Sequence, residues 1–335
     1  MTHMTKEPND VMAEADLLQS GVPEGGEKHI MRKKKKIDPL HVIFILAFTI
    51  PSVVYFCVFY VYVNFNSFIM AFQTRRQGTL YWTLEHFARF FKEIVQSESE
   101  IQTAFRNTFF TFLIGQVMFV VGFFVSYFLY KKVPMSKFFR ICFFLPGLIS
   151  GTIVSSIFIR IVGVGGPIAP IYQQLFHLEY EPTLLSDPRF ANSIVWGNLI
   201  WLGFPGNMIL FGGTLSRLPE SVLEQAKLDG VSWIQEAFKI IIPIIWPMIS
   251  LLLVLNIAGI FGASGNVFLL TKGDAGTQTV SNWMFMQVYN TVGNPDVSNA
   301  YNYLSAVGMV LTIVSVGIAL SVRKIAGTYF EGVTY

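Results

Sequence analysis

The sequence is poor in charge. Asp, Glu, Lys and Arg make up only 13% of its 335 residues, whereas a typical soluble domain carries about 25%. Hydrophobic residues make up 53%, and the mean hydropathy is +0.51. This composition excludes a soluble enzyme, a disordered scaffold and a collagen-like rod. The net charge of +3 is too small to indicate a nucleic-acid partner.

Cysteine is almost absent as well. The two cysteines, Cys57 and Cys142, both lie in apolar stretches, which excludes a disulfide framework and a cysteine metal site. The five histidines are scattered and form no H-E-x-x-H motif. No G-x-x-x-x-G-K-[ST] loop is available to hold nucleotide phosphates. We therefore predict no metal, no cofactor and no catalytic residue, and any ATP hydrolysis would belong to another chain.

One short motif is similar to a catalytic one. Gly262-Ala263-Ser264-Gly265 resembles the G-x-S-G of intramembrane serine proteases. A serine nucleophile needs a base within hydrogen-bonding reach, normally His, and no His follows Ser264 in the sequence. Close packing of helices at small residues explains the motif better than catalysis does.

Six long runs contain no Asp, Glu, Lys or Arg, and each has at least 19 residues. About 20 helical residues cross the roughly 30 Å core of a bilayer, whereas the strands of a membrane barrel would alternate in stretches of about 10. The sequence therefore predicts an all-α, polytopic membrane protein with six transmembrane helices. The runs are Leu40–Val63, Asn107–Tyr130, Ile141–Ile159, Ala191–Leu215, Ile240–Gly265 and Leu304–Val322.

The basic residues beside these runs predict the orientation. A cluster over 32–36 precedes the first run, Lys131 and Lys132 follow the second, and Arg323 and Lys324 follow the sixth. On the opposite side, most basic residues lie in or beside the long loop 65–103, and long loops cross a membrane largely regardless of charge. We expect both termini to be cytoplasmic.

The lack of charge within the runs also bears on the energy source. Ion-coupled carriers usually keep acidic or basic side chains in their spans. A sodium site built from backbone carbonyls and hydroxyls would leave no such mark. An ion-coupled secondary carrier or channel without an ATPase therefore remains the alternative to the function inferred below.

The loop between the fourth and fifth runs has strong helix signals. Pro219 suits the first position of a helix, and Gly230 suits its end. Ser232 and Gln235 form a capping-box pattern that begins a second helix leading to Pro243. Two short helices that meet at a glycine are either an interfacial element lying on lipid or a docking element for a cytoplasmic partner.

This loop resembles the signature of permease subunits in binding-protein-dependent ABC importers, E-A-A-x3-G-x9-I-x-L-P. Every interval of the signature is kept. Gln replaces the first Ala and Ile replaces Leu, and both changes are mild, because Gln is a good helix former and Ile keeps an apolar side chain. The matching residues are Glu224-Gln225-Ala226, Gly230, Ile240 and Ile242-Pro243.

Four further segments resemble motifs of the carbohydrate branch of that family, the maltose, glycerol-phosphate and multiple-sugar type. They are similar to A-x-R-N-T, F-x-L-P, W-L-G-F/Y-P and L-T-x-G-G-P. In the last of them, Asp274-Ala275 replaces the final Gly-Pro, which changes the local turn. The segments are Ala104–Thr108, Phe143–Pro146, Trp201–Pro205 and Leu270–Gly273.

The resemblance implies the core of a type I ABC importer permease, which binds no cofactor and does no bond chemistry. It also implies the partners: a second permease, usually a non-identical homologue, with a homodimer as the alternative; two cytoplasmic ATPase subunits; an extracytoplasmic solute-binding protein; and membrane lipid. The location would be the cytoplasmic membrane of a bacterium or archaeon. The sequence does not indicate which sugar is carried.

For the site, the resemblance assigns ATPase coupling to six residues of the loop. Among them Glu224 offers a carboxylate to the partner, Ala226 permits close approach, and Gly230 permits a turn with positive φ. The six are Glu224, Gln225, Ala226, Asp229, Gly230 and Pro243.

A sugar path needs an aromatic face and neutral hydrogen-bonding groups. We expect Trp201, Gly203 and Asn256 to form it. Packing between helices is the other interpretation of Asn256. Asn198 and Asn207 are weaker candidates.

The chain is accordingly divided into four parts. Residues 1–38 form a cytoplasmic tail with a basic cluster, and 39–103 hold the first transmembrane helix and a long external loop. Residues 104–324 form the permease core with the coupling loop 216–239, and 325–335 form a cytoplasmic tail. We also expect an amphipathic helix within 65–103 and a short helix at Ile171–His177.

Overall fold

The computed structural model describes residues 39–328, except 77, 97–98, 265 and 292–296. The predictions for the tail 1–38, and for the last residues of 325–335, lie outside the described part of the chain. The chain divides into two compact units, 1–60 and 61–335, and each is described by itself. The described part of the first unit is α2 (Pro39–Phe56) and the beginning of the π-helix η1 (Cys57–Tyr62). From Ile43 onward its side chains are exposed and mostly apolar, as suits a helix in lipid.

The second unit begins with a helix, a hairpin and a helix. Its hairpin pairs Gln73 with Trp82 in antiparallel register, and the all-α prediction did not include it, because four-residue strands leave little periodicity to detect. The predicted amphipathic helix is confirmed as α4, whose Phe90 packs against Tyr303 and Leu304 of the last helix. The elements are α3 (Val63–Ala71), β1 (Gln73–Arg76), β2 (Thr79–Trp82) and α4 (Glu85–Val95).

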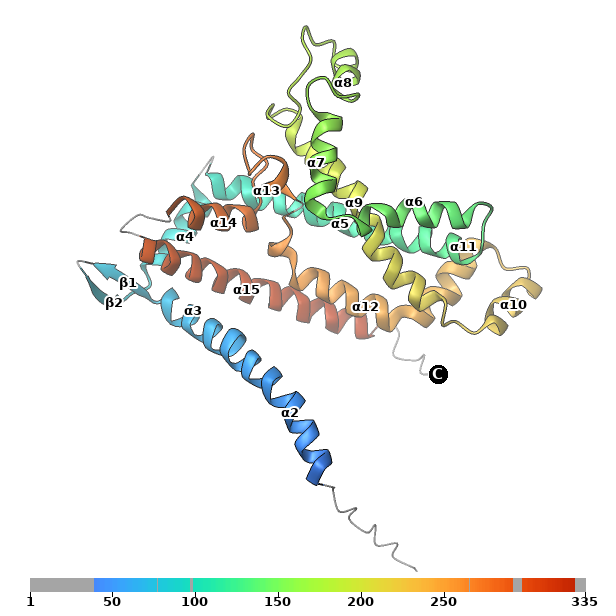
Figure 1. Ribbon diagram of the computed structural model, residues 1–335, viewed down its shortest axis with the longest axis horizontal. Coiled ribbons are helices and arrows are strands. Elements are labelled where there is room, and N and C mark those ends of the chain that lie inside the picture. The colour runs from blue at the N-terminus through green and yellow to red at the C-terminus, as the bar shows by residue number, and fades with distance from the viewer. Residues whose placement is uncertain (1–38, 77, 97–98, 265, 292–296, 329–335) are drawn as a thin grey trace, which may run out of the picture. The chain divides into compact units, whose positions relative to one another are not determined.

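Two long helices, α5 (Glu100–Tyr130) and α9 (Ala191–Leu215), lie side by side (Figure 1). A glycine lets them meet: a Cβ atom on Gly122 would stand only 2.7 Å from the Asn207 Cβ atom. The second pair is α12 (Ile242–Ala258) and α15 (Val297–Thr328), where the Trp246 indole donates a hydrogen bond of 2.9 Å to the Ala326 carbonyl. These pairs form the framework on which the loops are held.

Five helical stretches in the described residues are long and apolar enough to cross a membrane, and a bent pair counts as the sixth. The bent pair is α6 (Ser136–Leu148) and α7 (Gly151–Val162), which meet at 104°. The prediction of six spans is therefore confirmed, but the run Ile141–Ile159 is not one straight helix. Pro146 and the glycines beside the break disfavour a continuous helix, and Ile149 adopts an extended conformation.

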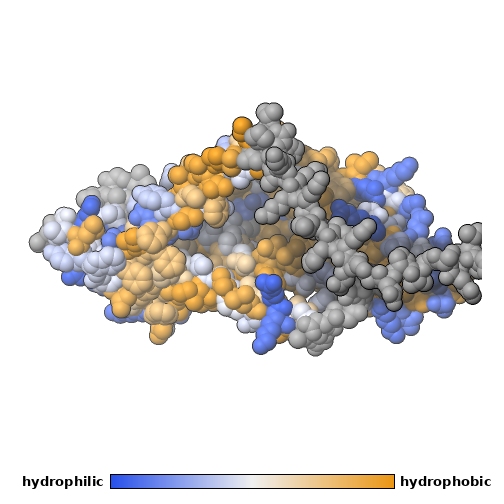
Figure 2. All heavy atoms as spheres, turned by 90° about the horizontal axis from the view of Figure 1, so that it is seen from below, coloured by the Kyte–Doolittle hydropathy of each residue, from blue (hydrophilic) through white to orange (hydrophobic). Residues whose placement is uncertain are grey.

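The remaining elements are short and lie in the connections. The predicted helix in 163–190 is confirmed as α8 (Ala169–Leu175), two residues earlier than expected. Hydrophobic residues cover much of the face seen in Figure 2, and hydrophilic residues gather at the end that carries α10. The other short elements are α10 (Glu220–Leu228), α11 (Trp233–Gln235), η2 (Glu236–Ile241), η3 (Ile260–Gly262), α13 (Val267–Leu270) and α14 (Val280–Thr291).

Candidate coupling loop and transmembrane cavity

The predicted pair of short helices is present in the loop between α9 and α12. Gly230 ends α10 with φ +66°, a conformation that favours glycine. The Val231 amide donates a bond of 3.1 Å to the Ala226 carbonyl, and the Gly230 amide one of 3.2 Å to the Lys227 carbonyl, the bond pattern of a Schellman C-cap. Pro219 lies one position earlier than predicted, because it is the residue before the first helical one.

The predicted capping box of α11 is also present. The Gln235 amide donates to Ser232 Oγ over 3.4 Å, and the Ser232 amide donates to Gln235 Oε1 over 3.3 Å. The caps of α10 and α11 thus satisfy backbone groups on both sides of residue 230, which gives this turn one defined geometry.

The six predicted coupling residues fall into three environments. Four of them are exposed on α10 or at its end: Glu224, Gln225, Asp229 and Gly230. Ala226 is buried against its own chain, so it is not on the surface that a partner would touch. Pro243 is half-buried near the start of α12.

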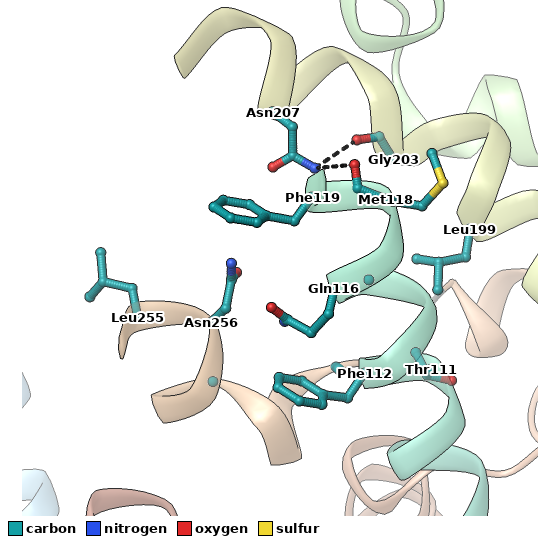
Figure 3. Close-up of a pocket in the computed structure, with 13 residues that line it drawn as sticks. Thr111, Phe112, Gln116, Met118, Phe119, Leu199, Gly203, Asn207, Leu255 and Asn256 are labelled. Carbon is teal, nitrogen blue, oxygen red and sulfur yellow. Dashed lines mark hydrogen bonds between the residues drawn. The ribbon is translucent and has the colours of Figure 1, made fainter. Parts of the chain in front are cut away.

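A cavity of about 330 Å³ lies between α5, α9 and α12 (Figure 3). Of the predicted path residues, Gly203 and Asn256 line it. Trp201 does not; its ring stacks on Phe158 of α7, with centroids 5.8 Å apart. Asn207, a weaker candidate, also lines the cavity and donates to the carbonyls of Gly203 over 3.3 Å and Met118 over 3.5 Å.

Two polar residues of the cavity were missed by the sequence reasoning, Thr111 and Gln116. Figure 3 shows that the Gln116 and Asn256 amides project into the space between α5 and α12. The α5 lining comes from positions 111, 112, 115, 116, 118 and 119, the spacing of one helix face. This spacing within the second apolar run, Asn107–Tyr130, could have indicated these two residues from the sequence.

The cavity can donate and accept hydrogen bonds but offers no charge. Its polar lining consists of hydroxyl and amide groups, and none of the described residues that line it is charged. Two phenylalanines, Phe112 and Phe119, add aromatic surface. Such a lining can form hydrogen bonds with a neutral, hydroxyl-rich molecule. Throughout the described residues, no cluster of three or more His, Cys, Asp or Glu side chains could hold a metal.

Two of the sequence motifs contact each other, and a third contacts the loop that follows the fourth. Phe143 of α6 stacks on Phe204 of α9, with ring centroids 5.2 Å apart. A Cβ atom on Gly147 would stand 2.5 Å from the Pro205 Cβ atom. The F-x-L-P and W-L-G-F-P segments therefore fix the end of α6 against α9, just before the bend into α7.

A second pair joins the start of α5 to the loop 271–280. Asn107 Nδ2 donates to the carbonyls of Gly276 over 2.7 Å and Gln278 over 2.9 Å. The Val280 amide donates a hydrogen bond of 2.9 Å to Thr108 Oγ1. At the substituted position in this loop, Ala275 adopts φ +54°, a conformation that non-glycine residues rarely take.

No family model matches the chain. Curated relatives include the multiple sugar-binding transport system permease protein MsmF of Streptococcus mutans, 28% identical over 202 residues, which are 60% of this chain and 67% of MsmF. The arabinooligosaccharides transport system permease protein AraP of Bacillus subtilis is 26% identical over 323 residues, 93% of this chain and 95% of AraP. The maltose/maltodextrin permease protein MalF of Vibrio vulnificus is 33% identical over 108 residues, 32% of this chain and 20% of MalF.

The fold is similar to that of a chain in the crystal structure of a bacterial ABC transporter involved in the import of the acidic polysaccharide alginate. The TM-score is 0.69 at 19% identity, over 87% of this chain and 98% of that chain. The same transporter in complex with an alginate pentasaccharide-bound periplasmic protein gives a TM-score of 0.68. Sequence relatives and fold agree: the chain, an integral membrane protein, is similar in sequence to permease proteins of sugar transport systems and in fold to a chain of an ABC transporter.

Proposed function

We propose that this permease forms the translocation path of an ATP-driven sugar importer and couples it to a separate ATPase through the loop 218–243. The observation that carries the proposal is the loop itself: the glycine turn at Gly230 holds α10, on which Glu224 and Gln225 are exposed. A short helix presented this way fits a groove on a partner. The chain's own role is a path with alternating access, and the ATPase supplies the energy.

The proposed cargo is a mono- or oligosaccharide or a related carbohydrate. The names of the relatives MsmF, AraP and MalF refer to sugars, and amide, hydroxyl and aromatic groups line the cavity. The lack of charged lining residues in the described part of the chain favours an uncharged sugar on this half of the path, in contrast to the acidic alginate of the structural neighbour. Gly203 and Asn256 are the proposed path residues in the cavity, and Trp201 remains a predicted one on the α7 side.

The proposed setting is the cytoplasmic membrane of a bacterium or archaeon, with both termini and α10 in the cytoplasm. The proposed assembly contains a second, non-identical permease, two ATPase subunits and an extracytoplasmic solute-binding protein. The periplasmic protein in the complex of the structural neighbour supports the last of these. The domain division at 38, 103 and 324 is part of the same proposal.

Two substitutions in α10 test the coupling role. Glu224→Lys reverses the charge offered to the ATPase, which for a close, partly desolvated pair costs about 2–5 kcal/mol. Gly230→Pro replaces a φ of +66° by one near −65°. Because neither residue lies in a span, both variants should insert normally. After purification by a tag on this permease, ATPase recovery and hydrolysis stimulated by loaded binding protein should both fall sharply.

The matched control is Glu179→Lys, which makes the same charge change at an exposed position of the segment 163–190. Its ATPase recovery should equal that of the wild type. Wild-type recovery and stimulation in both α10 variants would contradict the docking role and favour an interfacial helix lying on lipid.

A further inference from the structure

A buried ion pair joins the end of α5 to the far side of the coupling loop. Lys131 Nζ lies 2.6 Å from Glu236 Oε2, and the Glu236 side chain is only 3% exposed. Lys131 directly follows the last residue of α5, and Glu236 directly follows α11. Lys131 lies outside the coupling signature, and Glu236 occupies one of its unspecified positions.

Tyr127 gives this contact a third member. It is fully buried on α5, and its hydroxyl accepts a hydrogen bond of 3.2 Å from Lys131 Nζ. The same hydroxyl donates a hydrogen bond of 3.4 Å to the carbonyl of Trp233, the first residue of α11. The end of α5 thus holds α11 and the start of η2 through separate bonds.

The hydrogen bonds within this group favour the charged form of Lys131. Burial lowers the pKa of the Lys131 ammonium, but the hydrogen bonds to Glu236 and Tyr127 outweigh this effect and leave that pKa raised. No described residue gives a hydrogen bond to Glu236 Oε1. A buried carboxylate with one free oxygen adds little net stability, since desolvation offsets the attraction, yet removing its partner leaves a costly unpaired charge. The pair is better suited to fixing a position than to stabilising the fold.

The helix that ends at this pair also lines the cavity. Phe119, Gln116 and Thr111 of α5 face the cavity, and Phe119 precedes Lys131 by about 18 Å along a helix that rises roughly 1.5 Å per residue. A displacement of α11 transmitted to Lys131 would therefore reach the cavity through one continuous helix.

We infer that Lys131, Glu236 and Tyr127 form a strut that transmits movement of the coupling loop to α5 and so to the cavity. The inference rests on the proposed coupling function. The three are positioning residues: α10 touches the ATPase, and the strut makes α5 follow α10 and α11. Loss of the strut should leave ATPase binding in place and uncouple hydrolysis from transport.

The first test is a double-mutant cycle on the purified complex with its ATPase and binding protein. Glu236→Gln leaves the partly exposed Lys131 ammonium without its carboxylate, and Lys131→Met leaves the buried Glu236 carboxylate unpaired, whereas the double variant leaves neither charge. Sugar transported per ATP hydrolysed should fall on the order of fivefold in each single variant. It should fall to the same level, and no further, in the double variant, because all three variants lack the strut. Lys132→Met, an exposed neighbour, should behave as wild type.

A second measurement needs no ATPase. With Cys57 and Cys142 replaced by serine, spin labels at Leu228→Cys on α10 and Val120→Cys on α5, both exposed positions, report the distance between loop and helix in the purified permease. The distance distribution should broaden to a similar extent in both single variants and in the double variant. Unchanged distributions and transport ratios in the single variants would overturn the strut. A double variant that recovers would show that an unpaired charge caused the losses, and losses that multiply would show that the two residues act independently; either result would overturn the strut as well.

The two readouts separate the strut from the function on which it rests. A wild-type complex with no stimulated hydrolysis would contradict the proposed function, while the label distances would still decide whether the strut exists.

Discussion

The coupling loop and the cavity are built from the chain in different ways. The loop takes its residues from one stretch, 218–243, and its geometry depends on local caps at Gly230 and Ser232. The cavity takes its lining from three helices and from two residues beyond the end of α12, with Thr111 at one end of the sequence range and Ala263 at the other. The loop exposes charged groups, whereas the cavity offers neutral ones.

This difference separates two kinds of failure. A change in the loop should impair ATP hydrolysis by the partner and leave the path open. A change in the cavity should close or weaken the path and leave the partner bound.

The largest effect concerns sidedness. Tyr180 is 76% exposed in the segment 163–190, and Leu228 is 88% exposed at the end of α10. With Cys57 and Cys142 replaced by serine, Tyr180→Cys should react with a membrane-impermeant thiol reagent in intact cells, and Leu228→Cys should react only after lysis. The reverse pattern would place the coupling loop outside the cell and contradict its proposed contact with a cytoplasmic ATPase.

The next effect is on passage through the cavity. A Cβ atom on Gly203 would stand 3.4 Å from the Met118 side chain, so Gly203→Ala fits with a small adjustment. Gly203→Leu overfills the site at a cost of about 1–3 kcal/mol. Sugar uptake should fall roughly tenfold to a hundredfold in the leucine variant, with ATPase recovery unchanged. Normal uptake in Gly203→Leu would remove this cavity from the path.

A smaller effect is expected for groups that would touch the sugar. Asn256→Ala removes an amide from the cavity and should raise the sugar concentration for half-maximal uptake about threefold to tenfold, the equivalent of one hydrogen bond. Trp201→Ala should impair uptake less, because its ring stacks on Phe158 and not on the cavity. A larger loss of uptake in Trp201→Ala than in Asn256→Ala would indicate that the sugar passes closer to α7 than to this cavity.

The smallest effect is on stability. Asn107→Ala removes both hydrogen bonds to the loop 271–280. The Gly276 carbonyl keeps its bond from Asn192 Nδ2, but the Gln278 carbonyl loses the Asn107 donor, which should lower the free energy of unfolding by about 1–3 kcal/mol. The change should appear as a lower thermal midpoint of the purified permease. Arg106→Ala, at the exposed neighbouring position, should leave the midpoint unchanged. Equal midpoints for both variants would contradict the inference that Asn107 holds the loop 271–280 against α5.

The same contrast explains how much could be predicted from the sequence. The coupling loop was predicted almost to the residue, because a proline, a glycine and a capping box act within a few positions of one another. Five of the spans were predictable from length and hydropathy alone. The 104° bend between α6 and α7 was not, since apolar length says nothing about a change of direction.

The rest of the site depends on contacts between distant segments. Gly203 and Asn256 were predicted and line the cavity, but that Gln116 lines it as well depends on the arrangement of α5, α9 and α12. The partners of the sequence motifs were equally hidden: nothing in A-x-R-N-T shows that Asn107 binds the carbonyls of the loop 271–280. The Lys131–Glu236 pair joins residues that no local pattern connects.

The central claim is that ATP hydrolysis by a partner drives sugar through this permease. The most direct measurement is sugar uptake by the complete complex in vesicles, with the ATPase facing ATP, the binding protein on the other side, and the proton and sodium gradients collapsed by ionophores. Uptake should require both ATP and the binding protein and should persist without ion gradients. Uptake that proceeds without the ATPase and stops when the gradients collapse would contradict it and indicate an ion-coupled carrier.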